Sequence, residues 1–251
     1  MSQRMHVLGW RLVAVTVIAV CWEVLAYSGW FFQEAIPSLT RIAAALLKLL
    51  LDTELWSNLA VTANELIAAT LIGTVLGTAV GLLLGSRRLL RQAYEPYLHY
   101  IAPTPKIIFF PVMLMWFGVG PASKIAMGAF ACFFPVALSV ATGLATLSPV
   151  LIRVGRSFST PPFHMTTRIF LPALRLPLLN GARLGIGTAL ITVLLAEMKL
   201  SDRGVGFLLF QSYTHFDIAQ MYALLLIVFS IAVLINMIAA RIAQSPGDTE
   251  G

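Results

Sequence analysis

The sequence predicts an all-α membrane protein with about six transmembrane helices. Of its 251 residues, 59% are apolar, only 11% are charged, and the mean hydropathy is +0.87. A chain with so few polar side chains cannot cover a water-soluble globule, so the lipid bilayer is the expected solvent. The 18 glycines and 13 prolines do not argue against helices, because membrane helices tolerate both.

Six apolar windows meet or approach the roughly 20 residues that cross a bilayer as a helix. They lie near 12–32, 66–84, 97–117, 125–144, 176–198 and 218–240. Pro103, Pro105 and Pro111 interrupt the third window, which also contains Lys106. Proline removes a helical hydrogen bond, so we expect this span to start in a kinked or partly unwound form. Together, residues 12–243 form the predicted transmembrane domain.

The N-terminus superficially resembles a secretory signal, because basic residues precede an apolar run. The run at 12–32 is too long for such a signal and lacks a convincing cleavage site, so it is interpreted as a retained first span. Residues 1–11 are then a cytoplasmic N-terminus. The polar residues 244–251 are expected to form a disordered tail.

Lysine and arginine are unevenly distributed between the two sides of the predicted bundle, and cytoplasmic connections carry the excess. With the N-terminus inside, the inner ends hold Arg4, Arg11, Arg87, Arg88, Arg91, Arg153, Arg156, Arg168, Arg175, Arg183 and Arg241. The outer ends hold only Arg41, Lys48, Lys124, Lys199 and Arg203. Both termini are therefore predicted to be cytoplasmic. The segment 38–51 between the first two spans is too short to cross, and we expect it along the outer surface.

Glycines recur every fourth residue in the second span, at Gly73, Gly77, Gly81 and Gly85. This spacing places them on one face of a helix, where small residues allow another helix to approach closely. Gly181, Gly185 and Gly187 in the fifth span are expected to act in the same way.

The connection at 145–175 is the longest one on the predicted cytoplasmic side. It carries Arg153, Arg156, Arg168 and Arg175 and a helix-compatible stretch at 150–158. Loops of this length without structure of their own are uncommon unless they are functional or disordered. We interpret it as a docking element for a cytoplasmic partner, and the alternative is an ordinary positively charged inner loop.

Residues 147–209, beginning LSPVLIRVGRSFSTPPF, resemble the signature region of binding-protein-dependent ABC transporter permeases. That family has a cytoplasmic Glu-Ala-Ala segment, a glycine four residues beyond it, and a Leu-Pro ahead of the next span. The corresponding positions here are Arg153, Val154 and Gly155, then Ser159, then Leu171 and Pro172. Arg153 replaces the family's acidic residue and Ser159 its glycine. Residues 82–136 resemble the branch that imports sulfonates, taurine and nitrate.

The resemblance implies a type I ABC importer permease that is itself non-catalytic and lies in a bacterial inner membrane. The residues implied to couple to the ATPase are Arg153, Val154, Gly155, Arg156, Ser159 and Phe163. The implied partners are a second permease chain as a homodimer, two cytoplasmic ABC ATPase subunits, and a periplasmic or lipid-anchored solute-binding protein. ATP and Mg²⁺ would bind the ATPase. The sequence contains no Gly-Lys dipeptide, and hence no Walker A phosphate loop.

The cargo implied by this branch is a small solute, and an anionic sulfonate, taurine or nitrate is the first expectation. A thiamine or riboflavin precursor or an aromatic acid is the alternative cargo, and an ion-driven secondary transporter is the alternative class. Lys106 and Glu197 are the candidate pathway residues, because ionisable groups within spans are often functional. For Glu197, structural pairing is weighed ahead of cargo contact. Dispersed histidines and two cysteines in apolar runs indicate no metal site, and scattered basic residues indicate no nucleic-acid partner.

Overall fold

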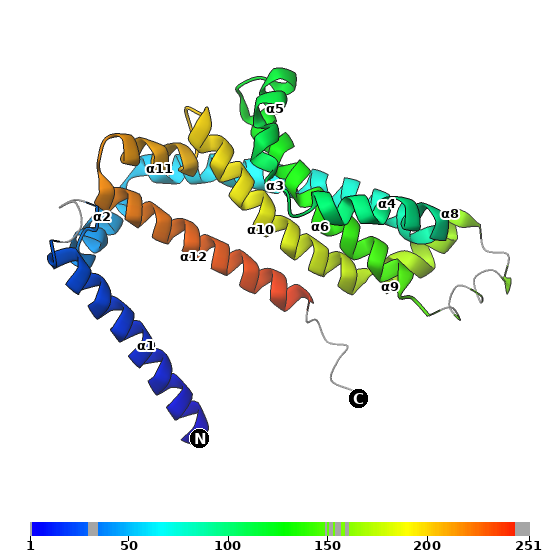
Figure 1. The fold of residues 1–251 in the computed structure, drawn as a ribbon, viewed down its shortest axis with the longest axis horizontal. Helices are drawn as coiled ribbons and strands as arrows, with labels where there is room; N and C mark the ends of the chain where they lie inside the picture. The colour runs from blue at the N-terminus through cyan, green and yellow to red at the C-terminus, as the bar shows by residue number, and fades with distance from the viewer. Residues whose placement is uncertain are drawn as a thin grey trace.

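The computed structural model describes residues 2–29, 35–148, 150, 153, 157–158 and 161–243, and throughout these residues the regular structure is helical. The predicted all-α fold class is therefore confirmed (Figure 1). The elements are α1 (Ser2–Tyr27), α2 (Leu39–Leu51), α3 (Thr53–Ser86), α4 (Arg88–Ile101), η1 (Lys106–Phe109), α5 (Phe110–Phe117), α6 (Pro121–Ala145), α8 (Pro162–Met165), η2 (Thr166–Phe170), α9 (Leu171–Ala173), α10 (Arg175–Lys199), α11 (Val205–Thr214) and α12 (Ile218–Ala243).

Five helices of the described chain are long and apolar enough to cross a membrane: α1, α3, α6, α10 and α12. A sixth crossing arises if α4 and the η1–α5 unit count as one span, although the two halves meet at 93°. The number of crossings is therefore five or six, in agreement with the six apolar windows of the sequence. Residues 2–11, expected as a separate N-terminal segment, form the beginning of helix α1, and the expected tail at 244–251 lies outside the described residues.

The break in the third span lies where the prolines predicted it. Helix α4 ends at Ile101, Pro105 precedes η1, and Pro111 occupies the first turn of α5, where its missing N–H costs nothing. The Lys106 ammonium group folds back onto the end of α4 and donates hydrogen bonds to the carbonyl oxygens of Ala102 and Thr104. It also lies 5.2 Å from the centre of the Phe134 ring. The lysine thus caps the end of a helix whose last carbonyls lack helical partners.

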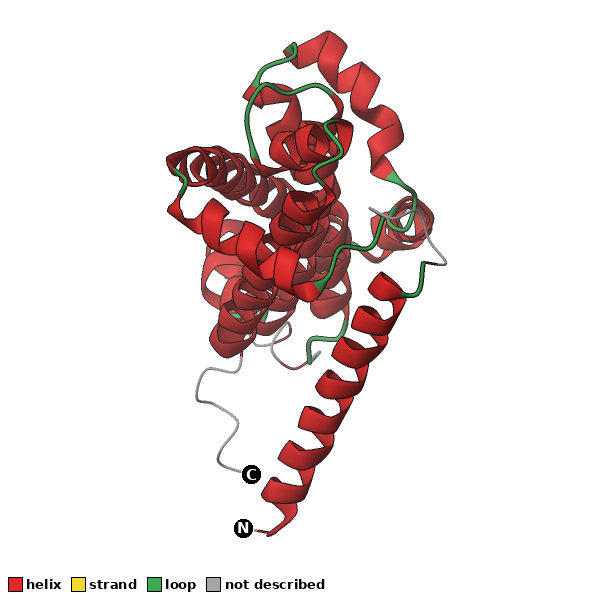
Figure 2. Cartoon of the chain, turned by 90° about the vertical axis from the view of Figure 1, so that its left-hand side faces the viewer, coloured by secondary structure: helices red, strands yellow, loops and turns green. Residues whose placement is uncertain are grey.

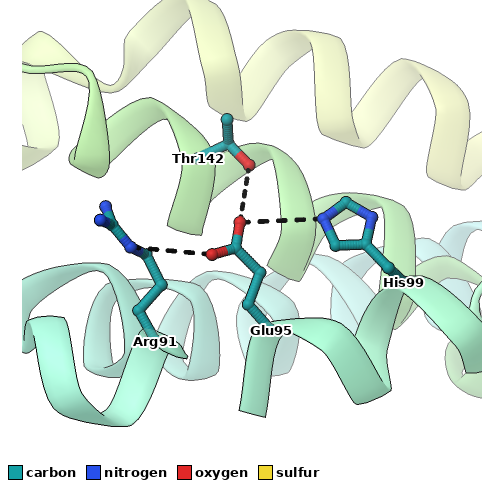
Figure 3. Close-up of polar contacts among 4 residues, drawn as sticks. All are labelled: Arg91, Glu95, His99 and Thr142. Carbon is teal, nitrogen blue, oxygen red and sulfur yellow. Dashed lines mark hydrogen bonds and ion pairs between the residues drawn. The ribbon is translucent and has the colours of Figure 1, made fainter. Parts of the chain in front are cut away.

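Helix α4 is attached to α6 through one carboxylate (Figure 3). The Glu95 carboxylate forms an ion pair with the Arg91 Nε atom at 3.7 Å and lies 3.8 Å from the His99 Nε2 atom. Both partners are one helical turn away on α4. The hydroxyl group of Thr142, on α6, donates to the same carboxylate at 3.4 Å. This contact fixes which face of α4 points toward the bundle.

The core of the bundle consists of α3, α6 and α10, which run side by side with α6 in contact with both neighbours (Figure 1). Its side chains are small or branched, and Cys132, Val136 and Val140 of α6 are fully buried. A second apolar cluster joins α2, α11 and the beginning of α12 at one end of the bundle. The loop that leads into α10 lies at the opposite end.

Helix α1 leans away from the bundle and is anchored at its C-terminal end (Figures 1 and 2). The Trp22 indole donates to the carbonyl oxygen of Pro37 at 3.0 Å and meets the Tyr222 ring edge to face. The Glu23 carboxylate accepts the backbone N–H of Leu39 at 3.0 Å, at the first residue of α2. Glu23 is therefore a structural partner of a helix N-terminus, where negative charge is favourable.

Candidate functional site

The four glycines of α3 all face α6. A Cβ atom built on Gly73, Gly77, Gly81 or Gly85 would lie 2.6 to 2.8 Å from the Cβ atoms of Cys132, Val136, Val140 and Leu144, respectively. These partners are also four residues apart, so the two helices meet in register along four successive turns. Backbone-to-backbone approach of this kind holds membrane helices together by van der Waals contact, since lipid offers no hydrophobic driving force.

Helix α10 also approaches α6 closely, through two of its three glycines. A Cβ atom on Gly181 would lie 2.8 Å from the Ser139 Cβ atom, and one on Gly185 would lie 2.6 Å from the Cys132 sulfur. Gly187 differs, because a Cβ atom there would meet nothing within 4 Å. The expectation of close packing therefore does not apply to Gly187, which borders open space.

Replacing Gly77 by alanine is expected to destabilise the protein by about 1–3 kcal/mol, the usual cost of overpacking. The new methyl group would lie 2.8 Å from both the Phe133 carbonyl oxygen and the Val136 Cβ atom, so the α6 backbone must shift. Gly187→Ala is the matched control, since it adds the same methyl group in open space and removes backbone entropy from the unfolded chain. In thermal unfolding of the purified variants, the midpoint temperature should fall below that of the parent only for Gly77→Ala. Equal midpoints for the two variants would contradict the packing argument.

Five polar side chains are buried together where α3, α6 and α10 meet, near the α11 end of the bundle. They are Asn58, Thr62, Glu65, Lys124 and Glu197, each 6% exposed or less. We call them the polar cluster. Burial of such groups in an apolar bundle is costly unless they are hydrogen-bonded, so their contacts are expected to be specific.

Glu197 is the centre of the polar cluster. Its two carboxylate oxygens accept hydrogen bonds from the Thr62 hydroxyl and from the Gly206 backbone N–H, both at 2.7 Å. Thr62 in turn accepts the Val205 N–H at 2.9 Å, and Asn58 accepts the Gly204 N–H at 2.6 Å. Three consecutive N–H groups at the start of α11 thus donate hydrogen bonds to side chains of α3 and α10. The cluster fixes α11 to the core of the bundle.

Two glycines make these contacts possible. Gly204 has φ +103°, a conformation that other residues rarely adopt, and a Cβ atom there would collide with the Glu197 carboxylate. A Cβ atom on Gly206 would lie 2.7 Å from that of Glu197. The segment before α11 can therefore approach Glu197 only because neither position carries a side chain.

Glu65 and Lys124 complete the polar cluster. Glu65 interacts with Glu197 and with the Lys124 charge, and its Oε2 atom has no hydrogen-bond partner among the described residues. The Lys124 ammonium group donates to the carbonyl oxygen of Val119 at 3.2 Å, in the turn before α6. One buried cation thus faces two buried carboxyl groups. Sequence reasoning singled out Glu197 but missed Asn58, Thr62 and Glu65, and it counted Lys124 only as an outer-side charge.

The described part of the connection between α6 and α10 exposes two aromatic rings. Phe158 is 81% exposed and Phe163 is 72% exposed. The Ser157 hydroxyl donates to the Arg153 carbonyl oxygen at 3.0 Å, and the Thr167 hydroxyl donates to that of Phe163 at 2.9 Å. Val154, Gly155, Arg156 and Ser159, which the resemblance assigns to ATPase coupling, lie outside the described residues.

The geometry defines a multi-pass helical membrane protein with a tightly packed core and a long connection that presents exposed aromatic rings at one end. Residues 69–245 match the family of binding-protein-dependent transport system inner membrane components. The chain belongs to this family of ABC transporter permeases.

Named relatives agree with this assignment. The chain is 30% identical to the taurine transport system permease protein TauC of Escherichia coli, over 70% of this chain and 63% of TauC. It is 28% identical to a putative aliphatic sulfonates transport permease, SsuC of Bacillus subtilis, over 80% of this chain and 74% of that protein. A probable ABC transporter permease of Haemophilus influenzae is 28% identical over 88% of this chain and 89% of its own length.

A solved structure supports the same fold. A chain from an inward-facing structure of the MetNI methionine ABC transporter superposes with a TM-score of 0.66 at 20% identity, covering 79% of this chain and 96% of that one. At this identity the likeness establishes the fold. The resemblance that the sequence predicted, to binding-protein-dependent ABC permeases, is confirmed by the family match.

Proposed function

We propose that this chain is the transmembrane subunit of an ATP-driven importer for a small sulfonate-type anion such as taurine. Two copies would enclose the pathway, two ATPase subunits would bind on the cytoplasmic side, and a solute-binding protein would deliver the cargo. ATP and Mg²⁺ would be bound by the ATPase, because this sequence has no phosphate loop of the Walker A type. The chain itself would be non-catalytic, and both of its termini would be cytoplasmic.

The family match over residues 69–245 is the observation that carries the proposal. The exposed rings of Phe158 and Phe163 support it, because protein interfaces rely on aromatic anchors that enter pockets of the partner. Arg153 gives the same connection a basic residue. A segment of this composition suits a docking surface better than a passive loop.

Two relatives named for taurine and aliphatic sulfonates support this substrate class. Both cargoes carry a sulfonate group, which is anionic at neutral pH. A thiamine or riboflavin precursor or an aromatic acid is the alternative cargo, and nitrate is a second anionic candidate of the same branch.

Uptake into proteoliposomes tests this proposal. The chain, co-expressed with its ATPase and its solute-binding protein, should import radiolabelled taurine or an alkanesulfonate only when ATP is supplied. The ATPase should also co-purify with the chain. Uptake by the permease alone, driven by a sodium or proton gradient, would instead assign it to the ion-driven secondary transporters. ATP-dependent uptake that excludes sulfonates but accepts a vitamin precursor would overturn the substrate and leave the transporter class intact.

A further inference from the structure

A groove of about 430 Å³ runs between α10 and α12 on the surface of the bundle. Most of its lining is aliphatic, with Leu190 and Leu194 from α10 and Val228 and Ala232 from α12. It also includes Gly187, the helical glycine beside which a Cβ atom would meet nothing within 4 Å. The groove therefore includes the open space beside Gly187.

One end of the groove is polar. There the Arg183 side chain lies in the lining and donates from Nε to the Asn236 amide oxygen at 2.7 Å. This hydrogen bond links α10 to α12. Asparagine is neutral, and among the described residues no carboxylate forms an ion pair with Arg183, so the guanidinium charge has no acidic partner there. The terminal nitrogens of an arginine can bind a phosphate oxygen in addition to such a contact.

The dimensions of the groove match one leaflet of a bilayer. Arg183 and Leu194 mark its ends on α10, and at 1.5 Å per residue the eleven-residue separation corresponds to ~16 Å. The hydrocarbon core of a bilayer is about 30 Å thick, so one leaflet contributes about 15 Å. Arg183 belongs to the third turn of α10, at the end of the bundle that holds the 145–175 connection. The lysine and arginine distribution predicts that this end is cytoplasmic.

We propose that this groove binds an anionic phospholipid of the inner leaflet, with an acyl chain along Gly187, Leu190 and Leu194 and the phosphate on Arg183. A long apolar groove with a single cation at one end has the chemical pattern of an amphiphile with an anionic head. A small anionic cargo would gain nothing from the aliphatic walls, so the groove is a lipid site rather than part of a transport pathway. This inference requires that the chain spans a membrane with the 145–175 connection on the cytoplasmic side, and it stands whatever the cargo is.

Photolabelling in lipid nanodiscs tests the proposal on the full chain together with the subunits that accompany it. The probe is phosphatidylglycerol with a photoreactive group in the middle of one acyl chain, and the same group on phosphatidylcholine is the neutral comparison. We expect the label on groove residues such as Leu190 and Val228, with phosphatidylglycerol preferred over phosphatidylcholine. A basic residue near a membrane surface contributes about 1 kcal/mol to the attraction of anionic lipid, which corresponds to an about fivefold preference.

Two pairs of variants separate the head group from the acyl chain. Arg183→Gln should abolish the preference for phosphatidylglycerol, whereas Arg175→Gln, at the start of the same helix, should retain it. Gly187→Phe fills open space and should remove most labelling of the groove, whereas Leu184→Phe, an exposed position outside the lining, should not. Because neither Gly187 nor Leu184 is buried, both phenylalanine variants should insert at the level of the parent chain.

Either of two results would overturn the proposal. One is labelling of the groove that is equal for the anionic and the neutral lipid, or no labelling there at all. The other is a disulfide cross-link between the variants Val228→Cys in one copy and Val17→Cys in a second copy, formed while the lipid label is excluded. That result would assign the groove to helix α1 of another protomer, whose candidate span has no buried residues in the single chain.

Discussion

Replacing Phe158 and Phe163 together by alanine should reduce ATP-driven uptake more than 100-fold while the chain remains inserted in the membrane. Both rings are largely exposed, so their removal costs the isolated permease little. If they enter pockets on the ATPase, each truncation removes an anchor of the kind that contributes about 2 kcal/mol or more to binding. Two such losses weaken docking by about a thousandfold, since 1.4 kcal/mol is a factor of ten. Co-purification of the ATPase and uptake by proteoliposomes measure the effect.

Phe210→Ala is the matched control for this pair. Phe210 is a partly exposed phenylalanine on α11, near the opposite end of the bundle, so its truncation should leave ATPase binding unchanged. If the double variant keeps both tight ATPase binding and full uptake, the connection between α6 and α10 is not the docking site. If binding persists and uptake is lost, the rings act after docking, in the transfer of motion to the spans.

The sequence predicted the packing face of α3 and the broken third span because both depend on local patterns. Glycines spaced by four lie on one helical face whatever surrounds them, as Gly77 and Gly81 illustrate. Pro105 and Pro111 disturb a helix through their own backbone geometry. The partner helix could not be derived in this way, because the contact between Gly77 and Val136 joins residues far apart in the chain.

The polar cluster illustrates the opposite case. The hydroxyl group of Thr62 binds a carboxylate 135 residues away, and no periodicity in the sequence relates the two positions. The hydropathy criterion also missed the cluster residues of α3. It placed the start of the apolar window at residue 66, whereas the helix begins at Thr53. A helix of 34 residues is ~51 Å long and exceeds the roughly 30 Å core of a bilayer. Its polar first half contributes Asn58, Thr62 and Glu65 to the cluster.

Helix α11 was not predicted, for a related reason. Residues 205–214 form only about three turns, too few to cross a bilayer, and the expected windows left them in a connection between two spans. Gly204 and Gly206 were the available signal, because glycines flanking an apolar stretch suggest close backbone approach. Their partner, Glu197, was recognised as an ionisable group within a span. Its contact with the start of α11 is seen only in the three-dimensional structure.

Removal of the Glu197 carboxylate should have the largest effect on stability of any single substitution considered. In Glu197→Ala, the Thr62 hydroxyl and the Gly206 N–H would both lose their acceptor while remaining buried, at about 1–3 kcal/mol for each unsatisfied group. The Lys124 charge would also lose one of its two buried acidic neighbours. The expected cost is therefore about 3–5 kcal/mol, in the range measured when one member of a buried charged network is removed. Thermal unfolding in detergent measures it.

Glu197→Gln distinguishes the hydrogen bonds from simple loss of volume. Glutamine has nearly the same shape but only one acceptor oxygen, so it can accept from Thr62 or from the Gly206 N–H but not from both. Its cost should therefore lie between those of the parent and Glu197→Ala. Glu54→Ala, which removes an exposed carboxylate at the start of α3, should change the unfolding midpoint little. Because the lost contacts hold α11, hydrogen exchange should rise first in the amides of 204–206; uniform exchange along the chain would show that Glu197 does not secure this helix.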